Sequence, residues 1–179
     1  MRQLLLLRHA KSSWDDPRQP DRDRPLNQRG RRAAARMRQA MHELGLVPDV
    51  VLVSTAKRTL ETLDSLEPWD DAPLVEPLDA LYLANAMQLL ATLHGVAETV
   101  RSVLLIGHNP GIHDLALSLV SRSAGPSEAM RRLEDGFPTG SLAEFSVPGP
   151  WWQLDSGGAR LVRFLTPRGL EGSNAPDAD

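Results

Sequence analysis

Two histidines and two arginines of this sequence stand just after short apolar runs: Arg8, His9, Arg58 and His108. Guanidinium groups stay charged and bind phosphate oxygens in a bidentate way, so they stabilise the spread charge of a phosphoryl transition state. The same positive field disfavours protonation of a nearby imidazole, which keeps one ring nitrogen available as a nucleophile. If these side chains converge, their chemistry predicts the transfer of a phosphoryl group.

Three buried strands are expected to position these side chains. Residues 4–7, 50–53 and 102–106 are, apart from Ser102, aliphatic runs without an amphipathic period, which is typical of buried strands in an α/β sheet. Ligands of open α/β sheets bind in the crevice outside the carboxyl ends of the strands. We therefore expect an α/β protein, a three-layer α/β/α sandwich with a mostly parallel central sheet.

The surroundings of Arg58 favour an anion at the start of a helix. Thr55 is expected to cap this helix and to place Arg58 in its first turn. A cation there opposes the helix dipole, while free helix-start amides and a guanidinium together suit phosphate, sulfate or carboxylate. The alternative is an ordinary surface ion pair of Arg58 with Glu61 or Asp64. After His108, Asn109 is expected to cap another helix.

A long polar loop, residues 15–25, follows the first predicted strand and is too rich in proline for a helix. We expect it to fold over the site, where Arg22 and Arg24 add positive charge to the rim. At the other end, residues 168–179 are polar and lack periodicity, so a disordered tail is predicted there. Residues 1–167 are expected to form a single domain.

The composition narrows the classes of function. The 179 residues carry a formal net charge of -3, which gives no electrostatic argument for nucleic acid or an anionic membrane. The chain has no cysteine, which fits the cytoplasm, and no stretch is expected to act as a targeting segment. Two imidazoles among two guanidiniums make a poor metal site, so neither metal nor cofactor is expected.

Three motifs in order carry a resemblance to a known family. They are Leu-Leu-Arg8-His9-Ala-Lys-Ser-Ser-Trp, Ser54-Thr-Ala-Lys-Arg-Thr-Leu-Glu-Thr62 and Gly107-His-Asn-Pro110. The sequence resembles the histidine phosphatase (phosphoglycerate mutase-like) superfamily. Two further stretches, Arg24-Pro-Leu-Asn-Gln-Arg-Gly30 and Pro138-Thr-Gly-Ser141, are similar to the small phosphohistidine phosphatases of the SixA type. The resemblance implies the phosphoglycerate mutase-like fold.

The resemblance also implies roles for individual residues. His9 matches the histidine that is transiently phosphorylated, and Asp79 is the candidate, by position, for the acid that protonates a leaving oxygen. Asp15 stands where the family often has an asparagine, and a carboxylate there would repel phosphate. Arg8, Arg58 and His108 match the rest of the phosphate pocket, and Ser12, Arg24 and Asn109 are expected to bind the substrate.

The sequence thus predicts a cofactor-independent phosphatase that forms a phosphohistidine on His9, with a phosphohistidine-bearing protein as the preferred substrate. A phosphomonoesterase for small molecules is the alternative within the same fold. A non-catalytic module that binds phosphate or a phosphopeptide is a further alternative, although such a module could dispense with His9. A mutase is disfavoured because it needs an enclosed site. The sequence does not specify the oligomeric state.

Overall fold

The computed structural model describes residues 1–121, 123 and 125–172, and its centre is a six-stranded sheet with the order β3-β2-β4-β1-β5-β6. The strands are β1 (Arg2–Arg8), β2 (Val50–Ser54), β3 (Leu74–Leu78), β4 (Ser102–Gly107), β5 (Leu142–Val147) and β6 (Arg160–Leu165). Strands β1 to β4 are parallel to one another, and β5 pairs with both β1 and β6 in antiparallel orientation. The predicted α/β fold with a mostly parallel sheet is confirmed.

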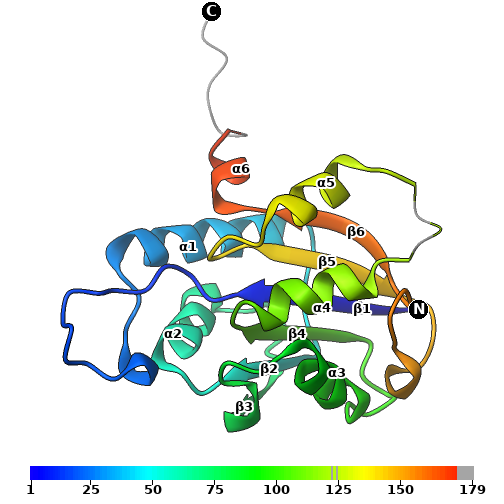
Figure 1. The fold of residues 1–179 in the computed structure, drawn as a ribbon, viewed down its shortest axis with the longest axis horizontal. Coiled ribbons are helices and arrows are strands. Elements are labelled where there is room, and N and C mark those ends of the chain that lie inside the picture. Colours follow the sequence, from blue (N-terminus) through cyan, green and yellow to red (C-terminus); the bar gives the residue numbers. More distant parts are fainter. Residues whose placement is uncertain (122, 124, 173–179) are drawn as a thin grey trace, which may run out of the picture.

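Helices cover both faces of this sheet, as Figure 1 shows. They are α1 (Gln28–Glu43), α2 (Lys57–Leu66), α3 (Ala86–His94), α4 (Gly111–Leu119), α5 (Glu128–Asp135) and α6 (Pro167–Gly172). The four central leucines of β1 alternate between the faces, because successive side chains of a strand point to opposite sides. Leu5 and Leu7 pack in one cluster with α1 and α2, whereas Leu4 and Leu6 pack in another with α3 and α4.

The chain beyond β6 differs from the prediction. The expected disordered tail begins at Arg168, but residues 167–172 form helix α6, and Leu170 packs against the same core cluster as α1 and α2. The prediction is wrong for these residues because the apolar contact of Leu170 and the ion pair of Glu171 with Arg36 of α1 are tertiary contacts that the local pattern does not reveal. Residues 173–179, which complete the predicted tail, lie outside the described residues. In the described residues, no helix is long and apolar enough to cross a membrane.

Two predicted helix caps are also wrong. The residue before α2 is Ala56 rather than Thr55, and it makes no side-chain capping bond. The residue before α4 is Pro110 rather than Asn109, again without a capping side chain. In both cases the polar side chain makes a tertiary contact instead: Thr55 donates to Asp79 and Asn109 donates to the Phe137 carbonyl.

Candidate active site

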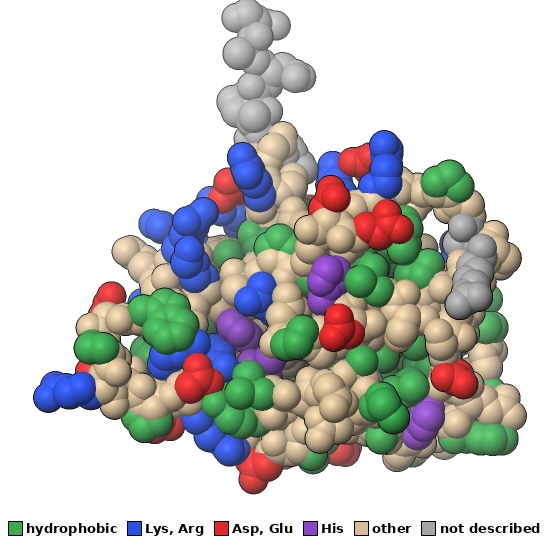
Figure 2. Space-filling model, viewed as in Figure 1, with side chains coloured by type: hydrophobic (Ala, Val, Ile, Leu, Met, Phe, Trp, Pro, Cys, Tyr) green, Lys and Arg blue, Asp and Glu red, His purple; other side chains and the backbone are tan. Residues whose placement is uncertain are grey.

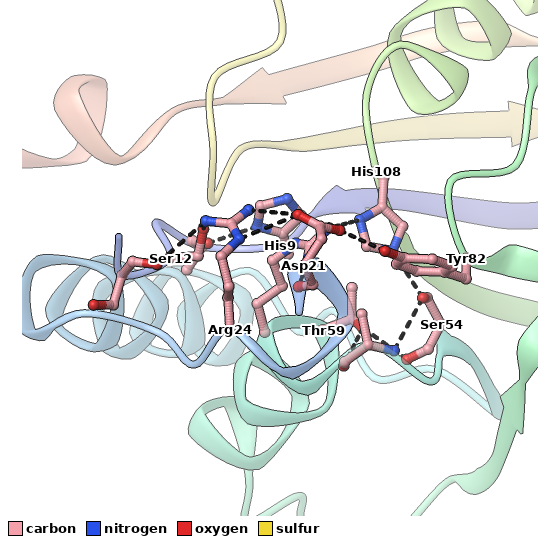
Figure 3. A network of polar contacts seen from close by, with 12 residues as sticks. His9, Ser12, Asp21, Arg24, Ser54, Thr59, Tyr82 and His108 are labelled. Carbon is pink, nitrogen blue, oxygen red and sulfur yellow. Dashed lines mark hydrogen bonds and ion pairs between the residues drawn. The ribbon is translucent and has the colours of Figure 1, made fainter. Parts of the chain in front are cut away.

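The carboxyl ends of the three central parallel strands bring the predicted residues together. In the sheet, β4 lies between β2 and β1, so the loop after β4 holds His108 between His9, after β1, and Arg58, in the first turn of α2. The ring centroids of His9 and His108 are 5.3 Å apart. Figure 3 shows both rings facing a common polar network, and Figure 2 shows histidines flanked by Lys and Arg side chains on the same face of the molecule.

The backbone around His9 is held from several sides. The His9 amide donates to the Gly107 carbonyl of β4 at 3.1 Å, and the amide of Gly140 donates to the His9 carbonyl at 3.0 Å. Gly140 has a φ of +74°, a backbone conformation that residues other than glycine rarely adopt. One residue further on, the Ala10 amide donates to the Thr62 hydroxyl of α2 at 3.0 Å. The nucleophile candidate therefore stands on a rigid backbone.

The ring of His9 has a defined tautomer. Its Nδ1 lies 2.7 Å from the Ala10 carbonyl oxygen, and because a carbonyl only accepts, Nδ1 must carry the proton. This leaves Nε2 with a free lone pair. Burial lowers the pKa of His9 to about 4, and the positive charges of Arg58, Arg8 and Arg24 act in the same direction. A neutral imidazole at neutral pH is what nucleophilic attack requires.

His108 is neutral and oriented through both ring nitrogens. Arg58 Nη2 lies 3.3 Å from its Nδ1, and Ser54 Oγ lies 2.7 Å from its Nε2. A guanidinium can only donate, so Nδ1 accepts, and Nε2 carries the ring proton and donates it in a hydrogen bond to Ser54 Oγ. Burial lowers the pKa of His108 to about 3, followed in importance by the nearby His9 and Arg58. Ser54 was not predicted as a site residue.

Both predicted arginines lie at the pocket with hydrogen-bonding capacity to spare. Arg58 is only 2% exposed and donates to the Asp21 carbonyl at 2.7 Å and to its carboxylate at 3.0 Å. It makes neither of the surface ion pairs with Glu61 or Asp64 that were the alternative. Arg8 Nη1 donates to the Phe137 carbonyl at 3.0 Å. The Nε atoms of both arginines are buried without a hydrogen-bond partner.

The loop formed by residues 15–25 lies against the pocket, as the sequence predicted. Arg24 is 6% exposed; its Nη1 donates to Ser12 Oγ at 2.7 Å and its Nε donates to the Asp21 carboxylate at 3.1 Å. The Tyr82 hydroxyl donates to the same carboxylate at 2.5 Å. Despite partial burial, hydrogen bonds from Tyr82 and Arg58 keep the pKa of Asp21 at about 2.

Asp21 and Tyr82 are site residues that the sequence did not predict. Asp21 lies in a run of aspartates, arginines and prolines without a period, and Tyr82 follows the short turn that contains Asp79. Neither position differs from a solvated loop in its local pattern. A lone tyrosine in a chain of few aromatics was the sole available signal.

Asp79 lies at the rim of the site, with its carboxylate bound by Thr55 and Arg22. These two hydrogen bonds lower the pKa of Asp79. They favour the ionised carboxylate, whereas a general acid must carry a proton. The role of Asp79 as the acid stays a prediction.

Asn109 lies beside the pocket, where its amide nitrogen donates to the Phe137 carbonyl at 2.9 Å. Its Oδ1 is buried without a partner. Ser12 is bound to Arg24 and pairs with Leu26 in an isolated bridge. Ser12 thus contacts Arg24, and Asn109 shares the Phe137 carbonyl with Arg8, while the contact of both residues with substrate stays a prediction. Within the described ranges, no group of three or more histidine, aspartate or glutamate residues could hold a metal ion.

Comparisons with known proteins agree with this geometry. Residues 4–77 match the sequence profile of the histidine phosphatase superfamily, branch 1. An uncharacterised protein of Mycobacterium tuberculosis is 35% identical over 162 residues, which cover 90% of this chain and 100% of that protein. An uncharacterised chloroplastic protein of Arabidopsis thaliana is 33% identical, over 86% of this chain and 76% of its own length.

Solved structures give similar matches. A proposed phosphohistidine phosphatase SixA from Nakamurella multipartitia superimposes with a TM-score of 0.81 and 34% identity, over 93% of this chain and 96% of that chain. A proposed phosphohistidine phosphatase SixA from Agrobacterium tumefaciens gives a TM-score of 0.78 and 29% identity, over 93% of this chain and 98% of that one. A SixA protein histidine phosphatase with bound tungstate, at 23% identity and a TM-score of 0.74, shares the fold.

Proposed function

Given that this chain belongs to the histidine phosphatase superfamily, among its SixA-type members, we propose that it removes phosphoryl groups from phosphohistidine residues of proteins. The chain is a phosphatase, a hydrolase that works through a histidine. The substrate class and the roles of individual residues are the proposed part, together with a cytoplasmic location, which the absence of cysteine supports.

The reaction begins with His9. Its Nε2 lone pair attacks the phosphorus atom in line with the leaving group, the bond from phosphorus to the leaving nitrogen breaks, and a phosphohistidine forms on the enzyme. A water molecule then attacks this phosphorus, the bond to His9 Nε2 breaks, and inorganic phosphate leaves. The hydrogen bond from Nδ1 to the Ala10 carbonyl holds the ring in the same tautomer throughout.

Arg8, Arg58 and His108 stabilise the charge of the transferring group. The guanidiniums supply permanent positive charge beside the attacked phosphorus. A bound phosphoryl group also favours the protonated form of His108, because its negative charge opposes the effects that lower this pKa. The added proton goes to Nδ1, since Nε2 already donates to Ser54, and Nδ1 can then donate to a phosphoryl oxygen.

The observation that carries the substrate class is that both carboxylates of the polar network are held ionised. Asp21 has a pKa of about 2, and the pKa of Asp79 is lowered. An alkoxide leaving group needs a proton from an acid, whereas the imidazole of a protonated phosphohistidine departs without one. The network therefore suits a phosphoramidate better than a phosphoester. A small phosphoester stays the alternative substrate.

Rapid-quench trapping tests the reaction. The wild-type protein is mixed with a radiolabelled phosphohistidine peptide, and we expect label on the protein that is acid-labile and base-stable. His9→Ala is expected to carry none, while it retains binding of inorganic phosphate through Arg8 and Arg58. Wild-type protein without label that binds phosphate as well as His9→Ala does would instead indicate a non-catalytic binding module.

A turnover screen tests the substrate class. Phosphohistidine peptides, phosphoserine peptides, sugar phosphates and nucleotides are compared by kcat/KM at equal ionic strength. We expect phosphohistidine to be preferred, and we expect Asp79→Asn to leave its turnover within about twofold of wild type, since no acid is needed. A higher kcat/KM for a sugar phosphate, with a large loss in Asp79→Asn, would contradict the proposal and favour the phosphomonoesterase.

A further inference from the structure

A groove of about 890 Å³ lies beside the active site, between α1, α6 and the turn at Pro138 and Thr139. Figure 2 shows Lys and Arg side chains gathered over α1 and α6 on this side of the molecule. The basic groove, as we call it, is lined by five cations: Lys11, Arg29, Arg32, Arg36 and Arg168. All five are exposed.

These charges are poorly compensated within the protein. Arg36 pairs with Glu171, but within the described residues no carboxylate pairs with the other four cations. Arg29, Arg32 and Arg36 are spaced so that they share one side of α1, where like charges repel one another. Arg29 also lies in the first turn of α1, where a cation opposes the helix dipole. The ion pair of Arg36 with Glu171, which also lines the groove, links α1 to α6, whereas in the described part of the chain the other four cations are not used in this way, and a chain with a net charge of -3 has no general excess of cations.

The groove is directly connected to the nucleophile. Lys11 is two residues beyond His9, and the turn at Pro138 and Thr139 leads into Gly140, whose amide donates to the His9 carbonyl at 3.0 Å. The helix that carries the arginines is equally close, because the amide of Asn27, at its start, donates to the Lys11 carbonyl at 3.0 Å. A substrate whose phosphoryl group reaches His9 therefore brings its flanking residues to the groove.

We propose that the basic groove binds an acidic segment of the phosphoprotein substrate. This inference rests on the proposed function and adds to it a preference for the sequence or surface around the phosphohistidine. Ala33, Pro138 and Pro167 contribute apolar lining between the cations, which suits the side chains of a polypeptide.

Two synthetic phosphohistidine peptides of equal length test the groove, one flanked by glutamates and one by glutamines. For the wild-type protein we expect kcat/KM to be about tenfold higher with the glutamate peptide, as several exposed ion pairs would give, and the preference to shrink as salt is added. Arg29→Glu/Arg32→Glu is expected to lose or invert the preference. The free phosphohistidine amino acid, which is too small to reach the groove, should be hydrolysed at wild-type rates.

Arg101→Glu/Arg160→Glu is the matched control. It makes the same change in net charge at two exposed arginines. Arg160 begins β6 and Arg101 precedes β4, so both lie at the end of the sheet opposite the site. We expect it to keep the preference for glutamate. An equal loss in the control, or a wild-type protein that treats both peptides alike, would overturn the groove proposal while leaving the phosphatase intact.

Failure of the proposed function would look different. A wild-type protein that hydrolyses sugar phosphates but neither peptide would contradict the phosphohistidine substrate, and the groove proposal would fail with it. Arg29→Gln/Arg32→Gln provides a milder variant if charge reversal disturbs folding, and it should show an intermediate preference. Binding of a short single-stranded DNA to wild type but not to Arg29→Glu/Arg32→Glu, at the salt concentration of the peptide assays, would overturn the proposal in favour of nucleic acid.

Discussion

Arg58 donates to Asp21 through two nitrogens, reaching the backbone carbonyl at 2.7 Å and the carboxylate at 3.0 Å. The carboxylate of Asp21 thus occupies a guanidinium that the mechanism assigns to the phosphoryl group. Figure 3 shows Asp21 in the polar network that also contains Arg24 and the two histidines. If Arg58 binds the phosphoryl group as proposed, substrate and Asp21 compete for the charge of the same guanidinium, and the negative charge of Asp21 disfavours a bound oxyanion.

The first prediction follows from this competition. Asp21→Asn removes a negative charge from beside the bound anion but keeps the size of the side chain. We expect the affinity for inorganic phosphate to rise about tenfold, equivalent to about 1.4 kcal/mol. Inhibition of turnover by phosphate measures this affinity. Asp23→Asn, an exposed neighbour on the same loop, is the control, and a rise of equal size there would contradict a specific role of Asp21.

The pH dependence of turnover provides a second prediction. His9 must be neutral to attack, and its pKa is about 4. The acid limb of kcat/KM, which reports the free enzyme, should therefore have its midpoint near pH 4 rather than near the usual 6.5 of a histidine. A midpoint above pH 6 would contradict a pKa of His9 that is lowered by burial.

The same pKa values make stability depend on pH. In the unfolded chain His9 and His108 take up protons below about pH 6.5, whereas in the folded protein they resist protonation down to about 4 and 3. Between these limits the unfolded state binds more protons than the folded state. The free energy of unfolding therefore falls as the pH falls from about 6.5 towards 4, and His9 contributes on the order of 3 kcal/mol to this fall. Urea unfolding at several pH values should show a shallower fall in His9→Gln/His108→Gln.

Ser54 is predicted to position His108. Ser54→Ala leaves the buried Nε2 proton of His108 without an acceptor, which costs about 1 to 3 kcal/mol. We expect kcat to fall about tenfold or more, with a shifted pH profile, because the tautomer of His108 is no longer fixed. Ser65→Ala, which removes a hydroxyl that donates to the Glu61 carbonyl within α2, should change neither quantity.

Gly30 is predicted to be needed for full stability and full activity. A Cβ atom at this position would lie 2.1 Å from the carbonyl oxygen of Lys11, so α1 would have to move away from the loop after β1. We expect Gly30→Ala to lower the free energy of unfolding by about 1 to 3 kcal/mol and to reduce kcat as well. Gly149→Ala meets nothing within 4 Å and should leave both unchanged, as thermal unfolding and turnover can establish.

The features that were predictable from the sequence are local ones. The aliphatic runs of β1, β2 and β4 are continuous, and the residues that follow them carry the chemistry, so His9, Arg58 and His108 could be placed at one edge of a sheet before the strand order was known. The start of α1 is local in the same sense, because the side chain of Asn27 accepts the amide of Gly30, only three residues further along the chain.

The features that escaped prediction depend on tertiary contacts. Thr55 and Asn109 have the types of helix caps, but Asp79 and the Phe137 carbonyl, distant in sequence, bind them instead. Asp21 enters the site because the loop folds back over α2, and nothing in its neighbours indicates that. The order of the strands likewise depends on pairing across long stretches of chain.

That strand order has a consequence for the biosynthesis of the protein. Because β4 separates β1 from β2 in the sheet, the strands that lead to His9 and to Arg58 have no contact of their own. A nascent polypeptide that has not yet released Ser102 to His108 from the ribosome lacks both His108 and the strand that lies between β1 and β2 in the sheet. We therefore expect hydrolysis to begin only after β4, the last of these three strands to be translated, has paired with β1 and β2.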